Sequence, residues 1–301
     1  MIDLSIIIVN WNSKDVLKDC LNSIYKSRFN SEYEILVVDN GSSDNSAEVI
    51  EKQFPHVRLI KNKENAGYAQ ANNQAIGESK GRYVLLLNPD TIILNNAIEK
   101  MVDFLSKNKD IGILGPKIFR RDGSLQISCY RFYSLSSLFS TKILFTRFGK
   151  GWFYKNFDYN QTKEVDVVAG ACLLIKREMI KNVGLLDERF FMYSEEADWC
   201  FRAKKSGWKV VFYPEAEIIH LIGASSENIQ EEMDVEAYRS QTKFFNKHFS
   251  KKKAKAMKTL LFAGVLLRVI VLNFLICFKP TKDNKRRLQK YRTVLKWYLK
   301  H

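Results

Sequence analysis

Cysteine is scarce in this chain, and its spacing excludes the usual thiol-based architectures. The five cysteines are odd in number and form no C-x-x-C pair, which argues against a disulfide framework. We expect them to be reduced and mostly buried. A basic, apolar leader is also lacking, because Met1-Ile2-Asp3-Leu4 runs directly into an apolar strand pattern. We therefore expect no secretory signal and a folded domain that faces the cytosol.

Acidic residues are almost absent beyond residue 250. Residues 251–301 hold 15 of the 48 Lys and Arg residues and a single acid, Asp283, so this tail carries a formal charge of +14 out of a total of +15. A total of this size is typical of nucleic-acid-binding proteins, but the first 250 residues are nearly neutral. We predict no nucleic-acid partner, and keep a non-enzymatic protein that binds nucleic acid or membranes as a distant alternative.

Apolar runs of strand length alternate with helical patterns in the first part of the chain, and we find no internal repeat. We predict strands over 4–9, 34–38, 57–60, 83–87 and 111–114, with helices over 14–27, 43–54, 68–77 and 97–108. Continuous Ile, Val and Leu strands separated by helices are typical of a mostly parallel sheet covered on both faces. The expected fold class is therefore α/β and Rossmann-like.

The pattern changes after Gly115-Pro116. Arg121-Asp122-Gly123-Ser124 predicts a hairpin turn, and the structure of 130–159 stays open. We predict regular structure over 165–175, helices over 195–206 and 231–249, and strands over 209–213 and 217–220.

A 19-residue apolar run over 260–278 is interrupted only by Arg268 and Asn273 among polar types. Its length and composition make a membrane span energetically possible. Nine Lys and Arg residues follow Phe278, and a single span from a cytosolic domain would export all of them, which the positive-inside rule disfavours. We therefore expect the run to lie in, or dip into, the inner leaflet.

The end of the tail has the pattern of a basic amphipathic helix. Four apolar residues recur at helical spacing among many Lys and Arg residues, namely Leu288, Tyr291, Leu295 and Tyr298. Such a pattern favours contact with an anionic membrane surface. The alternative is an ordinary surface helix that packs on the domain.

Polar side chains follow the first two predicted strands, in Val9-Asn10-Trp11-Asn12 and Val38-Asp39-Asn40-Gly41-Ser42. In parallel α/β sheets this edge holds ligands, and a carboxylate such as Asp39 can accept the imino N–H of a uracil or thymine. We expect the next helix to begin at Ser42 or Ser43. The alternative to the binding role is that Asp39 and Ser43 are turn and capping residues.

A glycine stands at the start of the third predicted helix, in Asn65-Ala66-Gly67-Tyr68. Gly67 would let backbone N–H groups approach a diphosphate, with Asn side chains as neutral donors. Alternatively, Asn65 caps the helix and Gly67 relieves a turn.

A lone carboxylate closes a further strand in Leu87-Asn88-Pro89-Asp90, and His220 ends a later one. The proline fixes the chain direction and aims Asp90 outward. An oxygen-rich site shared with a diphosphate suits Mg²⁺ or Mn²⁺. An Asx-Pro turn and a structural histidine are the alternatives.

Three acids, Glu195, Glu196 and Asp198, begin the helix predicted over 195–206. The helix dipole favours acids in a first turn by about 0.3–1 kcal/mol, which explains part of the cluster without any chemistry. The same dipole keeps a carboxylate ionised and able to accept a proton.

Taken in order, these motifs resemble those of the family 2 inverting glycosyltransferases of GT-A fold, and within them the bacterial rhamnosyltransferase-like group. The resemblance extends from about residue 4 to residue 226. Besides the motifs quoted, it rests on Ala169-Gly170-Ala171-Cys172, Phe191-Met192-Tyr193-Ser194-Glu195-Glu196-Ala197-Asp198 and His220-Leu221-Ile222-Gly223.

The resemblance implies a role for each matching residue. Asp39 would bind the pyrimidine, Asp90 the metal, and His220 the metal or the diphosphate. Glu196 would be the catalytic base, although many members have Asp there, so Glu195 and Asp198 stay open. Asn88 stands where many members have the first Asp of Asp-x-Asp. The remaining donor-binding residues would be Val9, Asn10, Asn12, Asn40, Asn65, Gly67, Asn88 and Gly170.

The implied activity is metal-dependent transfer of a sugar, L-rhamnose from dTDP-rhamnose first among the donors, in cell-surface polysaccharide synthesis. The acceptor would be a hydroxyl of a saccharide, for which we favour a lipid-linked (polyprenyl-linked) form. UDP-hexose or UDP-N-acetylhexosamine donors are the alternative. A nucleotidyltransferase would show a glycine- and basic-rich loop where Asn10-Trp11-Asn12-Ser13 stands. We expect a transferase domain over 1–250, with a nucleotide-binding half (1–115) and an acceptor half (116–250). The tail over 251–301 would hold it, peripheral or monotopic, on the cytoplasmic face of the inner or plasma membrane.

Overall fold

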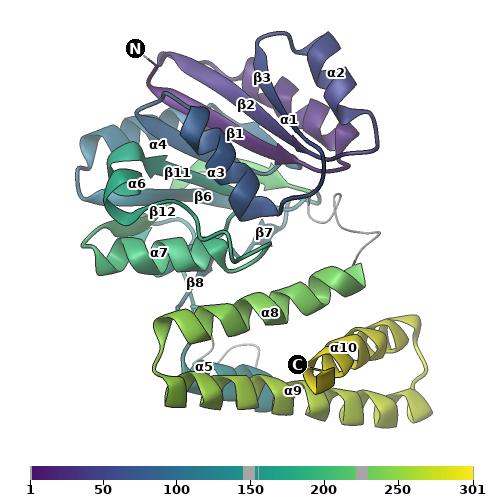
Figure 1. Ribbon diagram of the computed structural model, residues 1–301. Helices are drawn as coiled ribbons and strands as arrows, with labels where there is room; N and C mark the ends of the chain where they lie inside the picture. Colours follow the sequence, from purple (N-terminus) through teal and green to yellow (C-terminus); the bar gives the residue numbers. More distant parts are fainter. Residues whose placement is uncertain (1, 145–152, 155, 222–229, 301) are drawn as a thin grey trace. The chain divides into compact units, whose positions relative to one another are not determined.

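The computed structural model describes residues 2–144, 153–154, 156–221 and 230–300. Contacts divide the chain into two compact units (Figure 1). Unit 1 comprises Met1–Tyr130, Phe157–Phe191 and Glu195–Glu227, and unit 2 comprises Arg131–Asn156, Met192–Ser194 and Asn228–His301. These units do not coincide with the predicted boundary near residue 250 between a transferase domain and a tail. That boundary stays a prediction.

The first part of unit 1 alternates strands and helices as expected, to within a few residues at most ends. Its elements are β1 (Leu4–Asn10), α1 (Lys14–Lys26), β2 (Tyr33–Asn40), α2 (Ser46–Gln53), β3 (Val57–Asn62), α3 (Tyr68–Glu78), β4 (Tyr83–Leu87), β5 (Thr91–Leu94), α4 (Ala97–Lys107) and β6 (Ile111–Phe119). The short strand β5 is not among the predicted elements.

The second part of unit 1 is built from shorter strands and two helices. Its elements are β7 (Leu125–Gln126), β8 (Cys129–Tyr130), β9 (Lys163–Glu164), β10 (Val167–Val168), β11 (Cys172–Lys176), α6 (Arg177–Val183), α7 (Glu195–Lys205) and β12 (Lys209–His220). The hairpin at 121–124 is confirmed, because β6 and β7 pair antiparallel across it. The two strands expected over 209–213 and 217–220 are one strand, whose pairing with β6 shifts register between Tyr213 and Glu217. Pro214 lies in this bulge, where a residue without an N–H is tolerated.

The main sheet has the strand order β3-β2-β1-β4-β11-β6-β12-β5. Strands β3, β2, β1 and β4 are parallel. Beyond β4 the sheet is mixed, since β11 runs antiparallel to both β4 and β6, and β12 runs parallel to β6. The α/β class is confirmed, while parallel pairing without register shifts is confined to β1, β2, β3 and β4.

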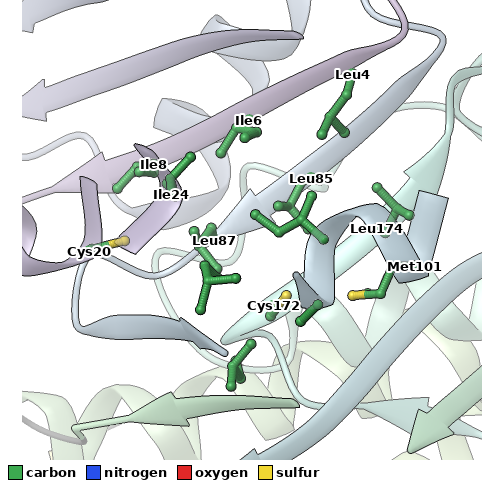
Figure 2. Packing of buried hydrophobic residues seen from close by; sticks show 14 of the residues in the cluster. Leu4, Ile6, Ile8, Cys20, Ile24, Leu85, Leu87, Met101, Cys172 and Leu174 are labelled. Carbon is green, nitrogen blue, oxygen red and sulfur yellow. The ribbon is translucent and has the colours of Figure 1, made fainter. Parts of the chain in front are cut away.

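Helices cover both faces of the sheet because its strands are apolar on both sides. Alternate residues such as Ile6, Ile8 and Leu85 share one buried cluster with residues of α1, α2 and α4. Figure 2 shows Cys20 and Ile24 of α1 and Met101 of α4 over this face. Helices α3, α6 and α7 pack on the opposite side, α3 against β1 and β2 and α7 against β6 and β12.

Unit 2 is helical. Its elements are α5 (Leu135–Leu138), the short π-helix η1 (Phe139–Ile143), α8 (Gln230–His248), α9 (Lys251–Phe278) and α10 (Lys282–Lys300). Phe244 and Phe245 of α8 are fully buried, and their rings lie edge-on to Tyr133 at 5.3 and 5.5 Å. The expected helical tail is confirmed. Within the described residues, α9 alone is long and apolar enough to cross a membrane, with a mean hydropathy of 2.5 over its most apolar stretch.

Candidate active site

The carboxylate of Asp39 lies at the end of β2 and accepts hydrogen bonds from two groups. Asn10, at the end of β1, donates from Nδ2 to Asp39 Oδ1 at 3.0 Å, and the backbone N–H of Ser42 donates to Oδ2 at 3.2 Å. Asn10 Nδ2 also donates to Ser42 Oγ at 3.1 Å. Asp39 is 4% exposed, so its position is fixed by these contacts before any ligand binds.

Asn12 joins the loops that follow β1 and β2. Its Oδ1 accepts from the backbone N–H of Ser43 at 2.8 Å, and its own N–H donates to Ser42 Oγ at 3.0 Å. The expected start of the next helix at Ser42 or Ser43 is wrong. Helix α2 begins at Ser46, whose N–H donates to Asp44 Oδ1 at 3.1 Å.

Asn40 organises the approach to α3. Its Oδ1 accepts from Asn62 Nδ2 at 3.0 Å and from the N–H of Ala66 at 3.1 Å, and its Nδ2 donates to Asn65 Oδ1 at 2.9 Å. Asn65 Oδ1 also accepts from the N–H of Gly67 at 3.0 Å. Asn40 and Asn65 therefore act here as a brace between β2, β3 and α3.

Gly67 has a structural task at the start of α3. Its φ is +86°, and a Cβ there would lie 2.7 Å from Phe191 Cδ2 and 2.8 Å from Phe191 O. The next N–H, of Tyr68, donates to Phe191 O at 2.7 Å. The idea that the first N–H groups of this helix are open to a diphosphate is thus corrected for Ala66, Gly67 and Tyr68, all of which bond within the protein.

Asp90 and His220 come together, as expected, where β5 begins and its partner strand β12 ends. Asp90 Oδ1 lies 3.2 Å from His220 Nε2, and both side chains are largely buried. Asn88 Nδ2 lies 3.4 Å from the same ring nitrogen. Gln126, a residue that the sequence did not single out, lies 3.2 Å from His220 Nδ1 through its Oε1 and orients the ring. Ile222 and Gly223, which complete this motif, lie outside the described residues.

The donor set at Asp90 and His220 fits a divalent cation. No group of three or more His, Cys, Asp or Glu side chains suited to a metal occurs in the described part of the chain. A cation held by Asp90 and His220 would therefore need further ligands, which substrate or water could supply. Carboxylate oxygen suits Mg²⁺ and Mn²⁺, whereas imidazole nitrogen suits transition metals. The pair therefore fits Mn²⁺ better than Mg²⁺.

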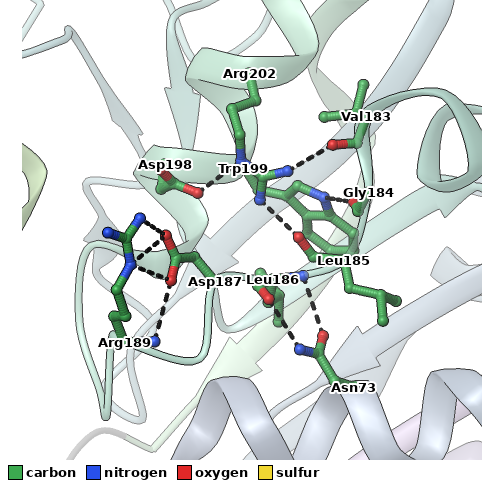
Figure 3. A network of polar contacts seen from close by, with 10 residues as sticks. All are labelled: Asn73, Val183, Gly184, Leu185, Leu186, Asp187, Arg189, Asp198, Trp199 and Arg202. Carbon is green, nitrogen blue, oxygen red and sulfur yellow. Dashed lines mark hydrogen bonds and ion pairs between the residues drawn. The ribbon is translucent and has the colours of Figure 1, made fainter. Parts of the chain in front are cut away.

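The acids at the start of α7 differ sharply in surroundings. Asp198 is fully buried and accepts from Arg202 Nε at 2.8 Å. The same guanidinium donates to the carbonyls of Val183 at 2.9 Å and Leu185 at 2.7 Å. Figure 3 shows Arg202 at the centre of this network. Asp198 is therefore part of the scaffold that holds α7 on the loop after α6.

Glu196 is half-buried and faces the backbone before β11. A Cβ on Gly170 would touch Glu196 Cβ and Cγ at 3.7 Å. Tyr68 donates from its hydroxyl to Gly170 O at 3.3 Å. Burial and the carboxylates of Glu195 and Glu196 raise the pKa of Tyr68, so the phenol stays protonated beside the two acids.

The candidate base and the candidate metal ligands are linked through one short stretch of backbone. The N–H of Asn88 donates to Ala171 O at 2.9 Å, and Gly170 next to it faces Glu196. Asp90 follows Asn88 by two residues, and the His220 ring lies against the Asn88 side chain. The structure therefore brings Asp90, His220 and Glu196 to one region of the sheet edge. Asp39 lies at the end of β2, which β1 separates from β4. Val9 lies buried in β1 beside this edge.

Comparisons with known proteins agree with this arrangement. The sequence model of glycosyl transferase family 2 matches residues 5–184 of this chain. An N-acetylglucosaminyl-diphospho-decaprenol L-rhamnosyltransferase of Mycobacterium tuberculosis is 33% identical over 205 residues, which cover 62% of this chain and 66% of that protein. A low-salt glycan biosynthesis hexosyltransferase of Haloferax volcanii is 30% identical over 222 residues, covering 72% of this chain and 67% of that protein. The chain thus spans about two thirds of each relative.

Among solved structures, the mannosyltransferase PcManGT of Pyrobaculum calidifontis, in complex with GDP-Man and Mn²⁺, has a TM-score of 0.59 at 13% identity. The superposition covers 97% of this chain and 84% of that one, and supports the GT-A fold alone. Because the family match covers more than half of the sequence, the chain belongs to glycosyl transferase family 2.

Proposed function

We propose that this protein is an inverting glycosyltransferase that moves a sugar from a nucleotide donor to a hydroxyl of a saccharide acceptor. The observation that carries the proposal is the link from Asp90 and His220, through Asn88 and the adjacent backbone, to Glu196. Such a link holds groups for a leaving diphosphate and for an incoming hydroxyl at fixed positions. Positioning of this kind supplies a large share of catalysis in group transfer.

The donor would be held by its base and by its diphosphate. Asp39 accepts the imino N–H of a uracil or thymine, and Asn10 fixes the carboxylate for that contact. Asp90 and His220 would bind a divalent cation, which when bound supplies neutralising charge to the diphosphate. Asn88 contacts the His220 ring and so helps to orient it.

The acceptor hydroxyl would be activated by Glu196. As the hydroxyl oxygen forms a bond to the anomeric carbon, its proton passes to the Glu196 carboxylate, and the bond from that carbon to the diphosphate oxygen breaks. The electron pair leaves with the nucleoside diphosphate, and the configuration at the carbon inverts. Asp198 is excluded from this role by its buried pairing with Arg202, while Glu195 remains the alternative base.

L-rhamnose from dTDP-rhamnose is the donor that we propose, and a polyprenyl-linked saccharide is the acceptor. The name of the mycobacterial relative supports both, since it describes an L-rhamnosyltransferase that acts on a decaprenol-linked substrate. A UDP-hexose donor is the second candidate, favoured by the haloarchaeal hexosyltransferase. We place the protein on the cytoplasmic face of an anionic membrane, with no nucleic-acid partner.

A panel of nucleotide sugars with the full-length protein tests the proposal. Release of the nucleoside diphosphate is measured with Mn²⁺, with Mg²⁺ and with EDTA. We expect Mn²⁺ to support turnover best, EDTA to abolish it, and Asp90→Asn to lose it with Mn²⁺ present. Equal turnover in EDTA would refute the assigned role of Asp90 and His220.

The base assignment is tested by Glu196→Gln against Glu195→Gln. Glu196→Gln keeps the shape of the side chain but cannot take a proton, so turnover should fall about 10²–10⁴-fold while donor affinity hardly changes. Glu195→Gln is the matched control. Normal turnover in Glu196→Gln together with collapse in Glu195→Gln would move the base to Glu195.

A further inference from the structure

Helix α9 exposes large apolar side chains along one face. Leu266, Ile270, Phe274 and Phe278 are 39%, 57%, 66% and 75% exposed. They are spaced by four residues, so they lie along one side of the helix. A contiguous exposed strip of this kind marks a protein or membrane contact rather than ordinary surface.

The same face begins in a groove within unit 2. The groove encloses about 790 Å³, and its lining is mostly apolar. Leu135 and Phe139 form one wall, and Ala256 and Leu260 of α9 form the other. Lys252 and Lys255 stand on it as exposed cations. An apolar channel with two cations matches an amphiphile that has an anionic head and a hydrocarbon chain.

The charge around the strip has a single sign. Residues 251–282 contain no acid, and α9 begins with five lysines in eight residues. Basic residues follow again after Phe278, in α10. Clusters of Lys and Arg beside apolar surface are attracted to anionic lipid headgroups.

The opposite face of α9 is tied into unit 2, which argues against a membrane span. Arg268 donates to the carbonyls of Thr141 at 2.7 Å and Gly264 at 2.9 Å, and also bonds to Lys142 O. Asn273 Oδ1 accepts from Arg292 of α10 at 2.7 Å. A helix that crossed the bilayer would carry these charged groups and their partners into hydrocarbon, where they are costly.

We propose that the exposed face of α9 and its adjoining groove form an interface for the anionic lipids of one membrane leaflet, on which the helix lies parallel to the surface. Leu266, Ile270, Phe274 and Phe278 enter the acyl region. Lys252 and Lys255 meet a lipid phosphate, and the groove takes part of its chain. This inference rests on the membrane partner of the proposed function but not on sugar transfer.

Vesicle binding of the full-length protein, without donor or acceptor, tests the interface. Phosphatidylcholine vesicles are compared with vesicles in which a quarter of the lipid is phosphatidylglycerol. Ile270→Glu/Phe274→Glu should lower the partition coefficient by about a hundredfold, whereas Leu185→Glu, an exposed leucine in unit 1, should leave it unchanged. Circular dichroism checks that the variants fold. Equal binding of all three proteins would overturn the proposal.

The lysine contribution is isolated by charge-matched variants. Lys252→Glu/Lys255→Glu should weaken binding to anionic vesicles by roughly 25-fold, at about fivefold per lysine, and hardly change binding to neutral ones. Lys52→Glu/Lys107→Glu, with the same change of charge in unit 1, should have a much smaller effect. Equal binding of the two double variants to anionic vesicles would overturn the assignment of Lys252 and Lys255 to a lipid phosphate.

Depth is measured with an environment-sensitive thiol dye, for which the chain offers a natural position. Cys277 is exposed and the other four cysteines are buried, so the wild-type protein can be labelled there. A second dye position is Ile270→Cys in a Cys277→Ser background. Quenchers near the headgroup should act more strongly than quenchers at the bilayer centre at both positions. Stronger quenching from the centre at position 270 would demonstrate a span. If the protein does not bind vesicles in these assays but still transfers sugar, the membrane inference is wrong and the transferase proposal stands.

Discussion

Within the acidic cluster at the start of α7, the buried ion pair with Arg202 makes Asp198 a structural residue, whereas Glu196 is the proposed base. Asp198 is fully buried and the Arg202 side chain is 19% exposed. Removing one partner from a buried ion pair costs about 3–5 kcal/mol. We therefore expect Asp198→Asn to lower the free energy of unfolding by about 3 kcal/mol, at the lower end because the amide keeps one hydrogen bond.

Arg202→Met should cost more than Asp198→Asn, because it also removes the donors to Val183 and Leu185. Each hydrogen bond from a charged group contributes about 1.5–3 kcal/mol. The double variant should cost less than the sum of the two single variants, since each already removes the shared ion pair. Urea denaturation of the full-length proteins measures all three values.

A neighbouring ion pair provides the control. Arg189 pairs with Asp187 at 2.6 Å, but its side chain is 70% exposed (Figure 3), and exposed pairs contribute about 1 kcal/mol or less. Arg189→Met should therefore have a small effect. Folded Asp198→Asn should keep turnover within about threefold of the wild type, since general-base losses begin near a hundredfold. Turnover reduced a hundredfold with unchanged stability would refute the scaffold role and assign the base to Asp198.

Three further predictions concern backbone, thiol and pH. Gly67→Ala should lower the free energy of unfolding by about 1–3 kcal/mol, since φ is +86° and Phe191 leaves no room for a Cβ. Gly77 has open space around it, so Gly77→Ala should leave this free energy unchanged or raise it. Calorimetry measures both variants. A thiol reagent should modify one cysteine quickly in the folded protein, Cys277, because burial raises the thiol pKa of the other four; fast reaction of a second thiol would contradict their burial. Burial and two nearby cations lower the pKa of Lys142 from 10.5 to about 8. Between about pH 8 and 10.5 the unfolded state therefore binds more protons than the folded state, and the free energy of unfolding should rise with pH. This rise, measured from urea midpoints, should be smaller in Lys142→Met.

The sequence located the strands well because runs such as Ile6-Ile7-Ile8-Val9 can be buried only where both faces of a sheet are covered. It missed β5, which has four residues, follows Pro89 almost directly, and owes its existence to pairing with β12 more than a hundred residues later. It also divided β12 at Pro214, because local pattern cannot show that both halves pair with the same neighbour.

At the site, positions at strand ends were predictable but partners were not. Asp90 and His220 were expected together, and they are. Gln126 gave no local signal, since its contact with His220 spans 94 residues. Asp198 did give one, because Arg202 follows at the i, i+4 spacing of a helical ion pair. Asp198 differs from the half-buried Glu196 in being completely buried. This burial depends on tertiary packing, which the spacing of residues in the sequence does not reveal.

Unit 2 consists of three stretches of chain, of which the first, Arg131–Asn156, precedes much of unit 1 in the sequence. During synthesis at about 5–20 residues per second, that stretch leaves the ribosome several seconds before α8 begins to appear. Its apolar residues, such as Tyr133 and Leu138, have no helices of unit 2 to pack against during this interval. Unit 2 therefore acquires its fold only after nearly all of unit 1 has been synthesised. The ribosome-bound chain thus passes through a stage in which the sheet of unit 1 can fold while the apolar residues of unit 2 are exposed to aggregation or to chaperones.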